Sequence, residues 1–271
     1  MTRIALLQMT AGIDPVGNAA TIVEAARRAA GEGAAMLFTP EMSGMLDRDR
    51  ARAAHTIARE GEDRVLAQAR EAAARERVWI ALGSLAIDRG DGKWANRSYL
   101  IDDAGAIAAR YDKLHMFDVD LASGESWRES NAYQPGDAVV TAWTPLGILG
   151  LTICYDLRFP ALFEALGRRS CDAVAIPAAF TVPTGAAHWH VLQRARAIEA
   201  SAYVVAAAQV GAHEDGRHTY GHSLVVDPWG EVLLDMGGEE PGLGFAEIDP
   251  AKIAQARQQV PSLANRRKLP N

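Results

Sequence analysis

Cysteine is scarce in this chain of 271 residues, because only Cys154 and Cys171 are present. Two cysteines exclude the disulfide framework that holds small secreted domains together, and they suit a reducing compartment in which each thiol stays free. The sequence also lacks an apolar run long enough to span a membrane, since charged or turn-forming residues interrupt every candidate. The apolar segment at residues 4–8 is too short for a secretory signal. We therefore expect a cytoplasmic protein with no membrane partner.

Concentrated positive charge is absent as well. The chain has 28 Lys and Arg against 34 Asp and Glu, which gives a net charge of -6. Its clearest basic cluster is the short run at residues 266–268, too small to indicate nucleic-acid binding, so we expect no nucleic-acid partner. Hydrophobic residues make up 49% of the chain, enough to form the core of a large α/β domain.

Strands alternate with helices along the whole chain. Short apolar runs between turn-forming residues predict strands at residues 3–9, 35–39, 78–85, 147–153, 172–178, 203–208 and 244–248. Apolar residues at helical spacing predict helices at residues 18–32, 62–77, 160–169, 188–200 and 250–259. Turn residues at 102–105 and 227–230 predict two hairpins.

No segment is rich enough in Pro, Gly or Ser to act as a linker between domains. Residues 1–260 are therefore predicted to form one α/β domain of stacked sheets covered by helices, and residues 261–271 a C-terminal tail. Residues 112–137 predict a long polar loop, and loops of this length inside a compact domain are usually functional or disordered.

Three polar residues stand where apolar strands end, and their chemistry is complementary. Glu41, Lys113 and Cys154 supply a carboxylate, an ammonium and a thiol. Sites in open α/β sheets gather at the carboxyl ends of strands. There a carboxylate can take the proton of a thiol, an ammonium can stabilise an oxyanion, and the thiolate can attack a carbonyl. The pattern predicts a nucleophilic site, but the spacing alone does not show that the three residues converge. A helix is predicted after Cys154, and we expect the dipole of this helix to favour the thiolate form of the cysteine.

Pro40-Glu41 and the segments at residues 111–118 and 153–160, in this order, resemble the nitrilase (carbon–nitrogen hydrolase) superfamily. The resemblance covers nearly the whole chain. It implies a four-layer α-β-β-α sandwich, with Glu41 as general base, Lys113 as the cation that stabilises the oxyanion and Cys154 as nucleophile. A further active-site glutamate is implied at Glu129, in a segment that resembles the corresponding family stretch, and Glu125 is the alternative.

Residues 179–190, 192–199 and 220–230 resemble the Nit subgroup, which contains deaminated glutathione amidases and ω-amidases. Residues 156–160 and 182–184 are closer to the first of these. The resemblance then implies that deaminated glutathione is hydrolysed to 2-oxoglutarate and cysteinylglycine through a thioester on Cys154. An ω-amidase acting on 2-oxoglutaramate, another aliphatic amidase or an N-carbamoyl hydrolase is the alternative. The resemblance further implies a small-molecule amide substrate, no cofactor and a homodimer or higher homo-oligomer.

Four residues near the nucleophile are expected to contact the substrate. The planar fork of Arg158 suits bidentate binding of a substrate carboxylate, and an ion pair with Asp156 is the structural alternative. The resemblance places Tyr155 beside the nucleophile, while Phe180 and Thr181 end the next strand and are expected to form pocket walls.

Histidines offer weaker alternatives. His188 and His190 are two residues apart and so face different sides of a helix, and residues 213–218 predict a solvated turn, so we expect no metal site. A Cys-His hydrolase that pairs Cys154 with His115 is chemically feasible, although Lys113 explains the same loop better. Cys171 precedes a buried strand and is expected to be a core thiol. A catalytically inactive scaffold is the non-enzyme alternative, and the presence of all three polar residues favours an enzyme.

Overall fold

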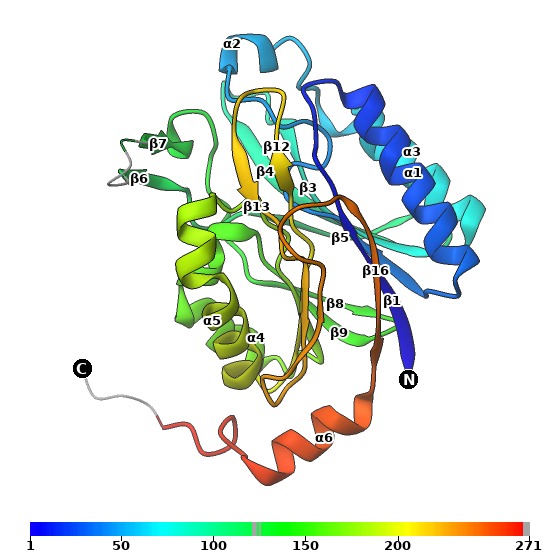
Figure 1. Cartoon of the computed structure of the whole chain (residues 1–271), viewed down its shortest axis with the longest axis vertical. Helices are drawn as coiled ribbons and strands as arrows, with labels where there is room; N and C mark the ends of the chain where they lie inside the picture. The colour runs from blue at the N-terminus through cyan, green and yellow to red at the C-terminus, as the bar shows by residue number, and fades with distance from the viewer. Residues whose placement is uncertain (121–123, 125, 268–271) are drawn as a thin grey trace.

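The computed structural model describes residues 1–120, 124 and 126–267, and Figure 1 shows that they form four layers. Within these residues, one six-stranded sheet has the order β16 (Gly242–Ile248), β1 (Thr2–Gln8), β2 (Met36–Phe38), β3 (Trp79–Asp88), β4 (Trp94–Ile101) and β5 (Ile107–Asp112). The other has the order β15 (Val232–Asp235), β14 (Leu224–Val226), β11 (Tyr203–Ala206), β10 (Ala173–Ala175), β9 (Gly147–Leu151) and β8 (Val140–Thr144).

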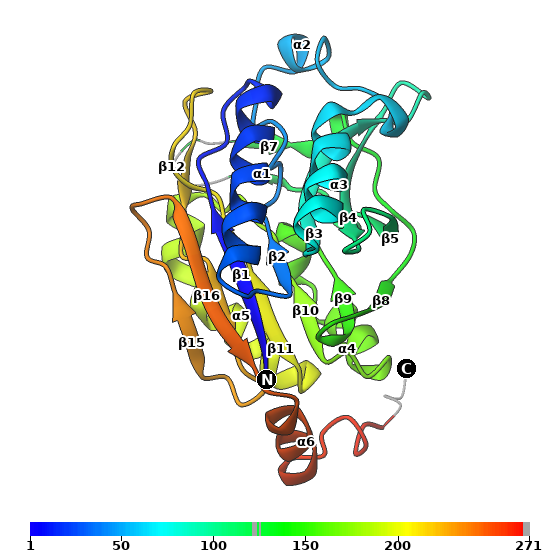
Figure 2. The same ribbon diagram turned by 90° about the vertical axis from the view of Figure 1, so that its right-hand side faces the viewer.

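Helices cover the outer face of each sheet. Helices α1 (Pro15–Gly31) and α3 (Arg64–Glu76) lie side by side over the first sheet, as Figure 2 shows. Helices α4 (Pro160–Arg168) and α5 (Val182–Ala200) lie on the opposite side of the molecule, against the second sheet. The predicted α-β-β-α sandwich is therefore confirmed.

Strands β1 and β2 of the first sheet are buried on both faces for most of their length, which explains why their sequences are apolar runs rather than alternating patterns. In β1, Ile4 and Leu6 belong to the core between the sheets, whereas Ala5 and Leu7 pack under the helices. The same period of two separates Met36 and Phe38 from Leu37 in β2, since successive side chains of a strand point to opposite faces.

Helix α1 shows how local sequence fixes the outer layer. The carboxylate of Asp14 accepts hydrogen bonds from the N–H groups of Val16 and Gly17, and Pro15 occupies the first turn, where its missing N–H costs nothing. Ile22 and Ala26 then lie on the buried face. The predicted helix began at residue 18, and the cap moves the observed start to Pro15.

Strand directions bring the carboxyl ends of β2 and β5 to one edge of the first sheet. Strands β1, β2 and β3 are mutually parallel. Strand β4 is antiparallel to β3 and β5 is antiparallel to β4, so β5 runs in the same direction as β2. In the second sheet, β9, β10 and β11 are also parallel. This arrangement lets segments far apart in the sequence meet at the ends of their strands.

Several boundaries differ from the predictions. Helix α5 begins at Val182, six residues before the predicted start, because Pro183 is accommodated in the first turn of a helix. Strand β8 was not predicted, and it is an edge strand whose Trp143 is 74% exposed, so its hydrophobic pattern is weak. The predicted long loop contains the short strands β6 (Asp118–Asp120) and β7 (Ser126–Arg128) and a 3-10 turn at Glu129–Asn131.

The predicted turn at residues 213–218 is present, with Glu214, Gly216 and His218 exposed, but the side chain of His213 is not solvated. His213 is 5% exposed, and its two ring nitrogens lie 2.9 Å from the carbonyl oxygen of Ala11 and 2.7 Å from Thr219 Oγ1. The hairpin of β12 (Val210–Ala212) and β13 (His218–Tyr220) folds over the segment after β1 and buries the ring. Burial also lowers the pKa of His213, which favours the neutral ring.

The segment after α6 packs on helices of the same chain. After α6 (Pro250–Gln259), Arg266 donates hydrogen bonds to the carbonyl oxygens of Glu164 in α4, at 2.9 Å, and Glu199 in α5, at 3.1 Å. The predicted tail therefore lies across a neighbouring surface of the same chain as far as residue 267, and residues 268–271 lie outside the described residues. Within the described part of the chain, no helix is both long and apolar enough to cross a membrane.

Candidate active site

The structure brings Glu41, Lys113 and Cys154 together, although 113 residues separate the first from the last in sequence. Glu41 follows β2, Lys113 follows β5, and Cys154 follows β9 on the facing sheet. Lys113 Nζ lies 2.9 Å from Glu41 Oε1, and Cys154 lies close enough to the Glu41 carboxylate for each group to shift the pKa of the other. All three residues are buried, with 5%, 2% and 7% of their surfaces exposed.

Glu129 contributes a second carboxylate to this cluster. Its two oxygens lie 3.1 and 2.9 Å from Lys113 Nζ, and Glu129 Oε2 also accepts a hydrogen bond of 2.6 Å from the backbone N–H of Phe117. The ammonium of Lys113 is therefore held between Glu41 and Glu129. The alternative, Glu125, lies outside the described residues.

Asn96 bridges the carboxylates of Glu41 and Glu129. Its Nδ2 donates hydrogen bonds of 3.0 Å to Glu41 Oε1 and of 3.0 Å to Glu129 Oε1. The other oxygen of Glu41 accepts a hydrogen bond of 3.0 Å from the backbone N–H of Ala179. Both oxygens of Glu41 thus have fixed partners, which orients this carboxylate toward Lys113 and Cys154.

The backbone around Glu41 is tightly packed. Gly83 of β3 passes so close that a β-carbon added there would lie 2.1 Å from the carbonyl oxygen of Thr39, and its N–H donates to Thr39 Oγ1 at 2.9 Å. Gln209, from the second half of the chain, donates a hydrogen bond of 2.9 Å to the Glu41 carbonyl oxygen. A side chain at position 83 would push the glutamate out of place, so only glycine fits there.

Cys154 occupies a sharp bend between β9 and a 3-10 turn at Cys154–Arg158. Its φ is 50°, in the left-handed region that is uncommon for a residue other than glycine, and its N–H donates to the carbonyl oxygen of Pro177 at 2.8 Å. Uncommon backbone conformations of this kind cluster at active sites, where the surrounding structure has to hold them in place.

The charges of the cluster follow from burial and from the neighbours. Burial raises the pKa of the Cys154 thiol, and the charge of Glu41 raises it further. Burial alone would lower the pKa of Lys113, but the charges of Glu129 and Glu41 raise it well above its usual value. Burial opposes ionisation of Glu41, but the charge of Lys113 and the hydrogen bonds to the carboxylate together outweigh burial, so the pKa of Glu41 is lowered. The resting site therefore holds a neutral thiol, an ammonium and an ionised carboxylate.

This result corrects the prediction that a helix dipole favours the thiolate. Helix α4 begins only at Pro160, six residues after the cysteine. The helix dipole acts within about one turn of the helix end, so it does not offset the burial of Cys154. The thiol needs a base to lose its proton, and the Glu41 carboxylate is close enough to affect its pKa.

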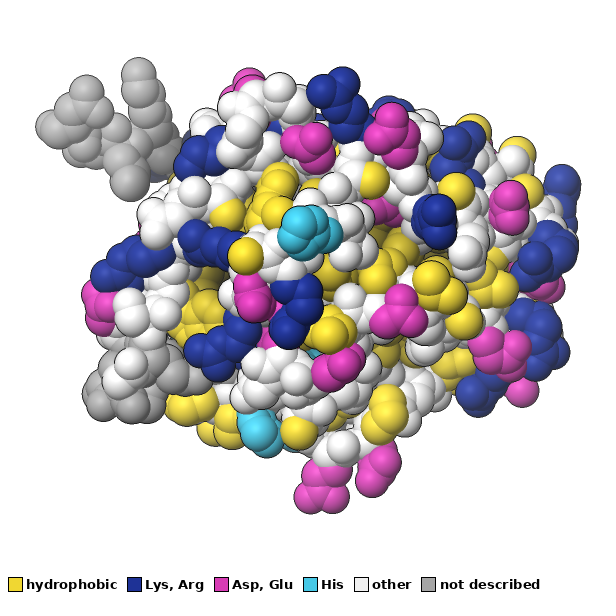
Figure 3. All heavy atoms as spheres, turned by 90° about the horizontal axis from the view of Figure 1, so that it is seen from above, with side chains coloured by type: hydrophobic (Ala, Val, Ile, Leu, Met, Phe, Trp, Pro, Cys, Tyr) yellow, Lys and Arg dark blue, Asp and Glu magenta, His cyan; other side chains and the backbone are white. Residues whose placement is uncertain are grey.

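A cavity of about 280 Å³ opens onto Glu41, Lys113, Cys154 and Glu129. Tyr155, Arg158, Phe180 and Thr181, the four residues expected to contact the substrate, all line it. Figure 3 views the molecule from the end that carries α2 (Arg50–Ala53), and on this face acidic, basic and hydrophobic side chains are interspersed.

Arg158 does not form the ion pair with Asp156 that was the structural alternative. Asp156 is fully buried and accepts hydrogen bonds from Tyr111 Oη at 2.6 Å and from the N–H of Ile153 at 2.8 Å. The guanidinium of Arg158 lies 5.4 Å from the ring centroid of Phe180 and 3.2 Å from His188 Nδ1. Among the described residues, Arg158 has no carboxylate partner, so its charge is available to a ligand in the cavity.

His115 has a structural environment. Its Nδ1 lies 2.7 Å from Asp156 Oδ1, and its ring stacks on Phe159 with 3.6 Å between the centroids. It does not line the cavity. Cys171 is fully buried, as predicted for a core thiol.

Sequence reasoning missed Asn96 and one aromatic wall of the cavity. Asparagine is rare inside strands, so its sequence position near the start of β4 gave no clear signal, and only the structure shows that Asn96 is fully buried. Trp127 also lines the cavity. The guanidinium carbons (Cζ) of Arg48 and Arg217 lie 5.9 and 5.3 Å from the centroid of its ring. Trp127 lies in the predicted loop, where no periodicity pointed to it.

A four-layer sandwich with a buried cysteine lining a cavity defines a protein of the nitrilase superfamily. A family profile described as carbon-nitrogen hydrolase matches residues 3–258, and the chain belongs to this family. The deaminated glutathione amidase of Yersinia enterocolitica is 39% identical, over 98% of this chain and 93% of that protein. The predicted resemblance is confirmed.

Solved structures agree. The crystal structure of the C. elegans NitFhit protein has a TM-score of 0.90 and 36% identity, over 98% of this chain and 65% of that one. A mutant amidase from Nesterenkonia sp. AN1, in which acrylamide has added to the active-site cysteine, has a TM-score of 0.81 and 27% identity, over 96% of this chain and 98% of that one.

Proposed function

We propose that this protein is an amidase that cleaves a linear amide through a thioester on Cys154, with Glu41, Lys113 and Glu129 in the site. The observation that carries the proposal is the buried cluster of thiol, carboxylate and ammonium beside one cavity, in which the ammonium of Lys113 is hydrogen-bonded to Glu41. Chemistry at the cysteine of the related Nesterenkonia amidase supports Cys154 as the nucleophile.

In the first half of the reaction, Glu41 takes the proton of the Cys154 thiol, and the sulfur attacks the amide carbon. The ammonium of Lys113 and the backbone N–H of Tyr155 stabilise the oxyanion. The C–N bond then breaks, and Glu41 returns the proton to the departing amine. The product is a thioester on Cys154, and Glu41 is ionised again.

In the second half, water attacks the thioester carbon and gives its proton to Glu41. The C–S bond breaks, the carboxylic acid leaves, and the proton returns to the sulfur. Glu129 does not need to move a proton. It holds Lys113 from the side opposite Glu41, and therefore acts as a positioning residue for the ammonium.

Deaminated glutathione is the substrate we propose, with 2-oxoglutarate and cysteinylglycine as products and no cofactor. The names of relatives at 39% identity in Yersinia enterocolitica and in Homo sapiens support this choice. So does Arg158, a cation in the cavity wall that can bind a carboxylate of the acyl chain. A substrate of ω-amidase, such as 2-oxoglutaramate, shares that acyl chain and differs only in the leaving group.

A substrate panel tests the proposal. The panel contains deaminated glutathione, 2-oxoglutaramate, an aliphatic amide, an N-carbamoyl amino acid and a nitrile. We expect kcat/KM to be highest for deaminated glutathione, and we expect Cys154→Ala to hydrolyse none of the five compounds. A higher kcat/KM for 2-oxoglutaramate would overturn the proposed substrate but would leave the assignment as an amidase intact. No turnover of any compound would favour the inactive scaffold.

A cytoplasmic homodimer remains our proposal for the state of the protein. Val191 and Ile198 are 67% and 50% exposed and lie two turns apart on one face of α5. Gly230 lies against Ile198, and its neighbour in sequence, Trp229, is 58% exposed. Apolar side chains grouped in this way favour burial against a second copy. Sedimentation as a monomer at micromolar concentration would contradict the dimer.

A further inference from the structure

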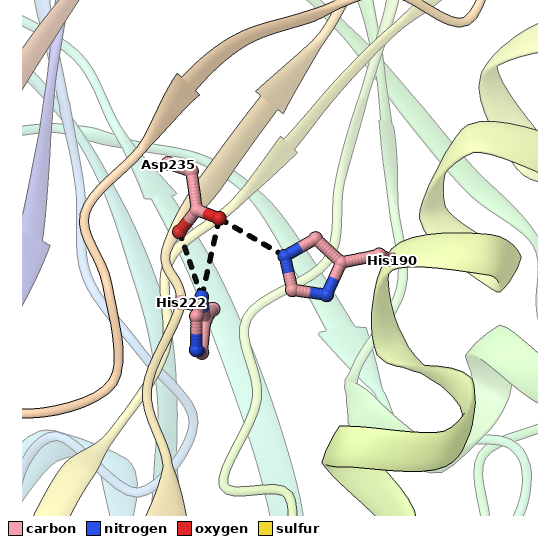
Figure 4. Close-up of side chains that lie close together, drawn as sticks. All are labelled: His190, His222 and Asp235. Carbon is pink, nitrogen blue, oxygen red and sulfur yellow. Dashed lines mark hydrogen bonds and ion pairs between the residues drawn. The ribbon is translucent and has the colours of Figure 1, made fainter.

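Two histidines and an aspartate from three separate elements meet outside the cavity. His190 lies on α5, His222 follows β13, and Asp235 ends β15. His190 Nε2 lies 3.0 Å from Asp235 Oδ2, and His222 Nδ1 lies 2.9 Å from Asp235 Oδ1. Figure 4 shows both rings directed toward the carboxylate, and the three potential ligand atoms all lie within 4.8 Å of one another.

Neighbouring groups hold two of the three side chains in place. The backbone of His222 donates a hydrogen bond of 2.7 Å to the carbonyl oxygen of Gly237 and accepts one of 2.8 Å from the indole of Trp189. The ring of His222 stacks on Tyr220, with 4.4 Å between centroids. Asp235 Oδ1 also accepts a hydrogen bond of 2.9 Å from the N–H of Gly237. Such outer contacts orient the ligands of metal sites.

We propose that His190, His222 and Asp235 bind one zinc ion or a similar divalent transition metal. Two imidazoles and one carboxylate are the donors that zinc prefers, and three protein ligands leave a fourth position for water. Tetrahedral zinc places its ligand atoms about 3.3 Å apart, given bond lengths of about 2.0–2.2 Å. Asp235 Oδ2 lies 3.0 Å from His190 Nε2 and 3.2 Å from His222 Nδ1, so these two separations need to open by only a few tenths of an ångström. The ligand nitrogens of the two histidines lie within 4.8 Å of each other and would move together as the ion binds.

Partial exposure gives an ion access to the site. The side chains of His190, His222 and Asp235 are 35%, 24% and 33% exposed. None of the three lines the cavity that contains Cys154. A bound ion would join α5 to β15, and the first turn of α5 carries Thr184, a wall of that cavity. The expected consequence is a more stable fold around the cavity, without a part in the chemistry.

A cysteine thiolate can bind zinc, and Cys154 lines an accessible cavity. Binding is therefore measured in a Cys154→Ala background of the full chain, purified without a polyhistidine tag. Titration calorimetry with Zn²⁺ is expected to show one ion bound with a micromolar or lower Kd, and a rise of several degrees in Tm. Co²⁺ is expected to give the visible absorption of a four-coordinate site.

Three variants and one control distinguish the proposed site from adventitious binding. His190→Ala, His222→Ala and Asp235→Asn are each expected to weaken Zn²⁺ binding by at least about tenfold and to abolish the rise in Tm. His188→Ala, a neighbouring histidine on α5 outside the cluster, is expected to bind as the parent does. Equal binding in all four variants, or no binding by the parent at about 100 µM Zn²⁺, would overturn the proposal.

Discussion

The amide nitrogen of Asn96 donates a hydrogen bond of 3.0 Å to Glu41 Oε1 from β4. The same nitrogen donates to Glu129, so one side chain fixes both carboxylates around Lys113. Asn96 is fully buried, and its own Oδ1 has no hydrogen-bond partner among the described residues. An unpaired buried oxygen is costly, which indicates that the position is set by the needs of the site rather than by stability.

Replacing Asn96 tests this role. Asn96→Ala is expected to lower kcat by roughly 10- to 100-fold with a smaller change in KM, because both carboxylates lose a buried hydrogen bond worth about 1.5–3 kcal/mol. Ser98→Ala is the matched control, since Ser98 is also buried, lies two residues along the same strand and donates to a backbone carbonyl instead. Equal losses of kcat in the two variants would show that the effect is structural.

Alkylation of the two cysteines tests the nucleophile. Iodoacetamide is expected to modify Cys154 selectively, because Cys154 lines the cavity beside Glu41 whereas Cys171 is fully buried. Peptide mapping gives the two rates, and Glu41→Gln is expected to slow modification of Cys154 by removing its base. Slow and equal labelling of both thiols would favour an inactive scaffold.

Arg158 is expected to determine the preference for acidic acyl chains. Arg158→Gln is predicted to lower kcat/KM for deaminated glutathione by about 10- to 100-fold, the effect of a charge-assisted hydrogen bond worth about 1.5–3 kcal/mol. Hydrolysis of a neutral aliphatic amide is expected to change little. Arg158→Lys keeps the charge without the fork, so an intermediate value is expected. A parallel loss on the neutral amide would show that Arg158 shapes the cavity instead.

The pH dependence distinguishes Glu41 from a histidine base. The pKa of Glu41 is lowered in the folded protein, so this base stays ionised until the pH falls below its usual value of about 4.3. We expect kcat/KM to hold from neutral pH down to that range and then to fall. A histidine acting as the base would instead produce a fall near the usual histidine pKa of about 6.5. Circular dichroism at each pH separates this effect from acid unfolding, because a carboxylate with a lowered pKa also stabilises the fold only above that range.

Local sequence was sufficient to predict most of the framework. Apolar runs and turn residues located the central strands, and the order of the segments around Glu41, Lys113 and Cys154 indicated the family. Boundaries were missed where an element is only partly buried, as in the edge strand Val140–Thr144, or where proline opens a helix, as at Pro183. In both cases hydrophobic periodicity carries too little information.

The sequence by itself determined the chemistry that is available, since residue types and their order identify a thiol, an ammonium and carboxylates at the ends of strands. Only the tertiary structure decided their protonation. A helix dipole was expected to favour the thiolate of Cys154, but burial and the nearby charge of Glu41 raise the pKa of the thiol. The tertiary structure also brought Asn96 into contact with the carboxylates of Glu41 and Glu129. It likewise brought together His190, His222 and Asp235, the residues of the proposed metal site. Sheets that fold face to face bring together residues far apart in the chain, and electrostatic interactions depend on distance and burial, which no local pattern records.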